Sequence, residues 1–206
     1  MSQKPHVSYS QVNMYLRCGE QYRRRYVEGE IIPPGVAMVQ GRAVHRAAQA
    51  NFEQKQQTHR DLPAREIVEI AAAAFEQDVQ AGVWFSPEEE SVGKEKVLGQ
   101  AKDATVRLAQ AHAQHQAPDY QPQAVEQFFR LELPAPRDVV GVVDLVDQEG
   151  RVVDLKTTTR RLSQERADKS LQLTLYAASY HQHTGRFRVR LKSCCAIGQD
   201  IENRSS

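Results

Sequence analysis

The chain has 206 residues, of which 40% are hydrophobic and 26% charged, and its formal net charge is +1. This composition is typical of a globular protein and excludes an intrinsically disordered one. No apolar stretch approaches the roughly 20 residues of a membrane helix, and the N-terminus lacks a signal core. We therefore expect a cytoplasmic protein with no membrane partner, whose charge argues neither for nor against nucleic acid.

The expected organisation is a single domain covering residues 1–206. Its parts are a helical N-terminal region (about 8–117), a sheet with one helix (about 123–195) and a polar tail (196–206). The cysteines Cys18, Cys194 and Cys195 are odd in number and the last two are adjacent, so we expect no disulfide framework.

The first two predicted helices lie on either side of a proline break. The stretch SYSQVNMYLRCGEQYRRRYV (8–27) predicts one amphipathic helix with Ser8 or Ser10 as its N-cap. After IIPPG, the pattern VAMVQGRAVHRAAQANFEQKQQ predicts a second helix that begins at Val36. It places Gly41 and His45 four residues apart, hence on one face.

Two further helices are expected to act as scaffold. One begins near Pro63, and the other begins with Ser86 as N-cap and Pro87 in its first position. Within the latter, Gly93 and Gly99 are weak points.

From Gln123 the hydrophobic period changes from that of a helix to that of a strand, and Pro134 ends the first strand. The segment GVVDLVDQEGRVVDLKTTT (141–159) supplies two more strands. Residues 164–182 return to helical character, and RFRVRLKSCC (186–195) alternates as a last strand. Helices, three antiparallel strands, a helix and a further strand predict an α/β fold.

The two middle strands should form a hairpin that brings charged side chains together. A three-residue turn at Gln148–Gly150, with glycine in the left-handed position, makes Asp144 face Asp154. Lys156 shares the same side because side chains alternate along a strand.

Two opposed carboxylates repel each other unless a positive charge neutralises them, which predicts a hard divalent cation such as Mg²⁺ or Mn²⁺. The alternative is a surface arrangement in which Asp144 lies at a sheet edge and Asp154 pairs with Lys156.

These motifs resemble the PD-(D/E)XK nuclease superfamily, which is marked by G-x-x-D followed by D-x-K-T. The match is closest to its RecB-like exonuclease branch, which includes CRISPR adaptation nucleases and resembles phage recombination exonucleases. GRAVH is similar to the G-x-x-x-H motif of that branch, VEQFF to the strand before the first metal acid, and QLTLY to its Q-x-x-x-Y motif. The resemblance implies a restriction-endonuclease-like core, with a mixed sheet of three antiparallel strands, a further strand after a crossover helix, and additional N-terminal helices.

The resemblance also implies a set of site residues. The metal ligands would be Asp144, Asp154, the backbone carbonyl of Leu155 and His45, with Glu126 as an accessory acid. An imidazole ligand favours Mn²⁺ somewhat over Mg²⁺.

Lys156 would orient or deprotonate the attacking water, a role that suits a compact ammonium. Gln172 and Tyr176, one helical turn apart, would hydrogen-bond a backbone phosphate or hold Lys156 in place. Arg160, Arg161 and Arg24 are candidates for contacts to DNA phosphates.

The implied activity is Mg²⁺- or Mn²⁺-dependent hydrolysis of DNA. We expect an exonuclease that processes linear ends, duplex or single-stranded, in a phage, recombination or repair context, with recombination or repair proteins as further partners. Some relatives hold an iron–sulfur cluster with four cysteines, and three cysteines cannot build one, so no cluster is expected. The alternatives are a binding module or degenerate copy of the same fold without strong cleavage, and an unrelated α/β protein.

Overall fold

Five strands form one mixed sheet in the computed structural model, which describes residues 4–157, 170–185 and, as backbone, 190–196. The strands are β1 (His6–Ser8), β2 (Pro122–Leu131), β3 (Asp138–Asp147), β4 (Arg151–Thr157) and β5 (Arg190–Ala196). β2, β3 and β4 are antiparallel, and β5 pairs in parallel with β4. The predicted fold class is confirmed, including the strand that follows the last helix.

β3 pairs with one strand along one edge and with two strands along the other. β2 covers the first edge from Val139 to Asp147. On the shared edge, β1 pairs in parallel with the beginning of β3, and β4 pairs with Leu145 and Val146 near its end. Asp144 therefore lies at a fork between β1 and β4. β1 was not predicted, because three residues are too few to show a period.

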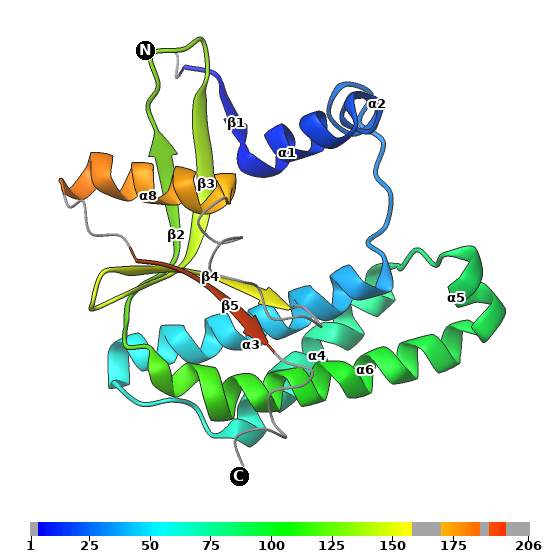
Figure 1. Cartoon of the computed structure of the whole chain (residues 1–206). Helices are drawn as coiled ribbons and strands as arrows, with labels where there is room; N and C mark the ends of the chain where they lie inside the picture. The colour runs from blue at the N-terminus through cyan, green and yellow to red at the C-terminus, as the bar shows by residue number, and fades with distance from the viewer. Residues whose placement is uncertain (1–3, 158–169, 186–189, 197–206) are drawn as a thin grey trace.

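The helices cover both faces of the sheet (Figure 1). They are α1 (Tyr9–Arg17), α2 (Gly19–Tyr22), α3 (Val36–Thr58), α4 (Ala64–Ala81), α5 (Pro87–Val92), α6 (Lys94–Ala111) and α8 (Leu171–Thr184), with two short π-helices, η1 (Arg23–Val27) and η2 (His112–Gln116), and one 3-10 helix, η3 (Ala117–Asp119). On one face, Leu173 of α8 packs against Val152. On the other, Phe52 of α3 packs against Val153, and α4 and α6 pack behind α3.

The hairpin has the predicted register. Leu145 pairs with Val153 and Val146 with Val152, which is the register that sets Asp144 opposite Asp154. Gly150, at φ 75°, occupies the left-handed position of the turn, where glycine has no steric penalty.

The predicted first helix is interrupted. Ser8 caps α1 as expected, but the helix ends at Cys18, whose backbone is extended (φ −160°, ψ 104°). The Cys18 sulfur then accepts a hydrogen bond from the Gln21 backbone N–H at 3.4 Å and so caps α2. None of the residues of α1 is buried, and its apolar stripe is open to solvent, with Leu16 70% exposed.

Two other helix boundaries differ from the prediction. The helix that begins after Ser86 ends at Gly93, where φ 100° and ψ 124° leave helical geometry, and α6 begins at the next residue. The interruption falls on one of the two glycines noted as weak points. The last helix begins at Leu171, because Ser170 caps it, and the earlier residues 164–169 lie outside the described part.

Candidate metal centre and active site

One imidazole and two carboxylates converge at the fork of β3. Nε2 of His45, on α3, lies 3.2 Å from Oδ2 of Asp144 and 3.6 Å from Oε1 of Glu126. One ligand atom from each of the three residues lies within 4.8 Å of the other two. The side chains are partly exposed, at 30% for His45, 27% for Glu126 and 13% for Asp144. Solvent and small ions can therefore reach this group.

Glu126 enters the group through a distortion of β2. Its φ of 48° is in the left-handed region, which costs a residue with a side chain about 1–2 kcal/mol. Side chains of β3 also stop alternating beside Glu126. Val143 and Val146 are three residues apart, so in a regular strand they would point to opposite faces, but both pack in the cluster on the α8 side. Strain of this kind persists where the surrounding structure imposes it, often at functional sites.

The strain at Glu126 predicts an unusual order of stabilities. Glu126→Gly is expected to be more stable than Glu126→Ala by about 1 kcal/mol, because glycine adopts positive φ without a Cβ clash. In an undistorted strand the order would be reversed. Urea denaturation of both variants in chelator measures the difference, and an alanine variant at least as stable as the glycine variant would contradict the strained backbone.

The group has the chemistry of a cation site. Oε1 of Glu126 and Oδ1 of Asp154 are buried and lack a hydrogen bond of good geometry from any described residue, although Nε2 of His45 lies 3.6 Å from the first and Nζ of Lys156 lies 3.1 Å from the second. Burial raises the pKa of the Glu126 carboxyl, with His45 opposing. The pKa of His45 is raised, first by its hydrogen bond to Asp144 and against the effect of burial. Carboxylates with unfilled acceptor sites beside an imidazole form a donor set that fits Mg²⁺ or Mn²⁺.

Asp154 lies beside this group but is not one of its three members. The Leu155 backbone N–H donates to Oδ2 of Asp144 at 2.7 Å, which ties β4 to β3 at this level. Asp154 is 3% exposed, and burial raises its pKa to about 6, with the charge of Lys156 opposing and that of Asp144 adding to the rise. Its Oδ1 lies 3.1 Å from Nζ of Lys156.

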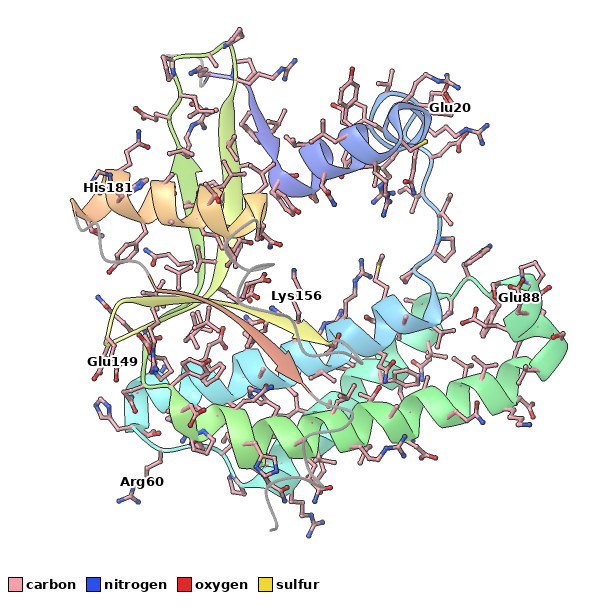
Figure 2. All side chains as sticks on the ribbon, viewed as in Figure 1. Glu20, Arg60, Glu88, Glu149, Lys156 and His181 are labelled. Carbon is pink, nitrogen blue, oxygen red and sulfur yellow. The ribbon has the colours of Figure 1, made fainter. Side chains whose placement is uncertain are left out.

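Lys156 is held by a chain of side chains from α8. Nζ donates to Oε1 of Gln172 at 3.1 Å, and Nε2 of Gln172 donates to the hydroxyl of Tyr176 at 2.6 Å. The Tyr176 ring packs edge-on against Phe129, with 5.3 Å between centroids, and burial raises the pKa of its phenol, which stays neutral. Figure 2 shows Lys156 projecting from β4 toward the side of the sheet that carries α8. The structure thus brings Lys156, Gln172 and Tyr176 together.

Two glycines of the sequence motifs allow close packing around the site. A Cβ on Gly41 would lie 2.9 Å from Oγ1 of Thr157, so glycine lets the end of β4 approach α3. A Cβ on Gly141 would lie 2.7 Å from the Phe129 ring. The ring of Phe129 supports Tyr176, a role that was not predicted for it. In the sequence Phe129 is one apolar residue of VEQFF, and only the register places it opposite Gly141.

The buried acids predict that the metal-free protein loses stability as pH rises. The folded-state pKa of Asp154 is raised, so its contribution is fully present below the unfolded-state value and lost as pH rises through about 6. The raised pKa values of Glu126 and His45 act in the same direction. Between about pH 4 and about pH 7 the free energy of unfolding should therefore fall by up to about 3 kcal/mol less in Asp154→Asn than in the wild type. Urea denaturation in chelator at the two pH values measures this difference. An unchanged pH dependence in the variant would contradict the burial of a charged Asp154.

The three arginines predicted to bind DNA are in different situations. Arg24 is about half exposed, but its guanidinium donates to Glu20 at 2.9 Å and lies 4.0 Å from Glu30, so nearby acids offset its charge. Arg160 and Arg161 lie outside the described residues. Arg42 of α3 was not predicted, yet it lies exposed one residue beyond Gly41 and beside the site.

No helix in the described part of the chain combines the length and apolar character needed to cross a membrane. In the comparisons with known proteins, residues 6–196 match the sequence profile of the PD-(D/E)XK nuclease superfamily. This match covers every described strand and helix. The chain matches none of the curated proteins.

Proposed function

Because the chain belongs to the PD-(D/E)XK nuclease superfamily, we propose that it is a deoxyribonuclease that uses Mg²⁺ or Mn²⁺ to hydrolyse phosphodiester bonds. The family itself implies a divalent-metal-dependent nuclease acting on nucleic acid. The observation that best supports the proposal is the group of His45, Glu126 and Asp144, next to a lysine held by hydrogen bonds. A protein that only binds DNA does not need closely spaced acids of this kind, because their mutual repulsion costs stability.

His45, Glu126 and Asp144 would hold the cation, with Asp154 and the Leu155 carbonyl adjoining it. When bound, a divalent cation lowers the pKa of water and neutralises negative charge at the phosphate during attack. The acids that would hold it are packed by the sheet, and the imidazole is fixed by its contact with Asp144. Preorganised ligands of this kind need little rearrangement to receive an ion.

Lys156 would act on the water and on the phosphate. Its ammonium lies between Asp154 and Gln172, where it can hold an attacking water, accept its proton after losing its own, or offset charge on a phosphate oxygen. Gln172 and Tyr176 would keep the ammonium in position. Tyr176, neutral because of its burial, can also donate its hydroxyl proton to a phosphate oxygen.

We further propose an exonuclease of the RecB-like branch that acts on DNA ends in the cytoplasm, in a phage, recombination or repair context. The support is the order of GRAVH, VEQFF, GVVD, DLKT and QLTLY along the chain. His45, Asp144, Lys156 and Gln172 from four of these segments surround one site.

The test is to incubate the protein with end-labelled linear duplex, single-stranded DNA and closed circular DNA, in Mg²⁺, Mn²⁺ or chelator. Metal-dependent loss of linear DNA with circular DNA intact is expected, and Lys156→Met should lack it. Cleavage of circular DNA at a rate comparable to that of linear DNA would show an endonuclease and overturn the exonuclease proposal. No cleavage of any substrate in either metal would overturn the proposed function.

A further inference from the structure

A cavity of about 540 Å³ adjoins the candidate metal centre. It lies between the first half of α3, the short helix η2 and the end of β4, and it shares His45 and Lys156 with the site. Its size is within the range of small-molecule sites in proteins, which hold groups such as a nucleoside. Any group bound in it would lie beside the candidate metal centre.

The cavity is apolar in its walls and cationic in its charges. Met38 and Leu155 contribute apolar surface, while Arg42 and Arg46 contribute positive charge. None of the described residues that line it is an aspartate or glutamate. This is the opposite of the neighbouring centre, where acids predominate. The cavity therefore suits a ligand that joins a flat apolar body to a phosphate.

Arg42 is the lining arginine that is available for a ligand. Arg46 donates to Asp78 at 2.8 Å, whereas Arg42 forms neither an ion pair nor a hydrogen bond with any described residue. A guanidinium that is exposed and unpaired can contact a phosphate without first breaking a protein contact.

His112, from η2, forms part of the inner wall of the cavity and is 2% exposed. Its Nδ1 is 3.0 Å from Oε1 of Gln116, and its Nε2 is buried with no hydrogen-bond partner in the described part of the chain. Because almost none of the Nε2 surface is accessible, a group bound in the cavity cannot contact this nitrogen unless the ring moves, so His112 acts as a wall of the cavity.

We propose that the cavity binds the base of a nucleotide adjacent to the scissile phosphate, with Arg42 contacting the next phosphate of the same strand. This inference rests on the proposed function, because the shared residues His45 and Lys156 make the cavity a subsite of the same active site. The apolar walls accept the faces of the base. The substrate is accordingly a strand whose base is unpaired at this position, since a base stacked in a duplex cannot enter a side cavity.

The experiment measures kcat/KM on single-stranded oligonucleotides that carry one abasic site, moved stepwise away from the cleaved bond. One position should show about a tenfold loss, the scale of one base's contacts, while the other positions show little. Ala37→Phe, a substitution of an exposed alanine of the lining, should cause a similar loss on the intact strand and abolish the sensitivity to that abasic site. Equal rates at every abasic position, or an unaffected Ala37→Phe, would overturn the inference.

A second readout separates this inference from the proposed function. Fluorescence anisotropy of a labelled oligonucleotide in chelator reports binding without cleavage. Arg42→Gln is expected to weaken binding about fivefold and to lower the salt slope by about one, whereas Arg107→Gln, an exposed arginine of α6, should leave both unchanged. If the wild type binds in this way but cleaves nothing, the subsite stands and the nuclease proposal fails. If cleavage occurs and Arg42→Gln matches Arg107→Gln, the subsite fails alone.

Discussion

Asp144→Asn is expected to reduce kcat/KM for DNA cleavage by about 10³-fold or more, the scale of losing electrostatic stabilisation of the transition state. Asp144 is the acid that contacts both His45 and the Leu155 backbone, so it lies at the centre of the proposed cation site. The asparagine keeps the shape and can still accept the Leu155 hydrogen bond, so the fold should survive. Single-turnover cleavage with saturating Mn²⁺ measures the loss.

A second acid of β3 provides the matched control. The Asp147 carboxylate accepts backbone hydrogen bonds from Glu149 and Arg151 and pairs with the Arg151 side chain, all within the turn. Asp147→Asn should therefore lower stability by about 1–3 kcal/mol and leave the cleavage rate of the folded protein near that of the wild type. Cleavage lost equally in both variants would show that Asp144 acts through the fold and not through the site.

Lys156→Met is expected to lower kcat about 10²- to 10⁴-fold, the usual range for a group that transfers a proton in the rate-limiting step. The methionine fills the same volume but cannot hold water or offset charge on a phosphate. Mn²⁺ affinity should persist, because Nζ is not among the proposed ligands, and DNA binding should fall by no more than one phosphate contact. Lys156→Arg is not expected to restore the rate, since a guanidinium does not give up its proton near neutral pH.

Lys102→Met is the control for that substitution. Lys102 is a partly exposed lysine of α6 that pairs with Glu76 at 2.5 Å, a surface ion pair worth little stability. Its replacement should leave cleavage unchanged. A Lys156→Met enzyme with a rate within a few-fold of the Lys102→Met enzyme would remove the lysine from the proposed chemistry.

The hairpin of the site could be predicted from the sequence because its information is local. Gly150 sets the turn, and the turn sets which residues of β3 and β4 face each other. The spacing of Asp154 and Lys156 then places both on one side of β4, as their 3.1 Å contact confirms. The one-turn spacing of Gln172 and Tyr176 likewise predicts that both side chains lie on the same face of α8, and their 2.6 Å hydrogen bond agrees with this.

The arrangement of the two acids next to Asp144 could not be predicted in the same way. Glu126 was considered only an accessory, yet with His45 and Asp144 it completes the group, and Asp154 lies outside it. The cause is the positive φ of Glu126, a conformation that no strand pattern indicates in a residue other than glycine. Strict alternation was assumed where the structure departs from it.

The cavity and the two helix breaks also could not be predicted from the sequence. Periodicity continues across Cys18 and Gly93, so the pattern predicts unbroken helices although the backbone turns at both residues. The cavity combines α3, η2 and β4, which are far apart in the chain, and only tertiary packing brings them together. Arg42 was therefore not singled out among the chain's many arginines.

The most direct test of the central claim is calorimetric titration of Mn²⁺ into the wild type, Asp144→Asn and Lys156→Met, without DNA. The account predicts saturable binding to the wild type, similar binding to Lys156→Met, and affinity lowered by at least about tenfold in Asp144→Asn, since a carboxylate ligand is lost there. Equal Mn²⁺ affinity in the wild type and Asp144→Asn would contradict a cation site built on His45, Glu126 and Asp144.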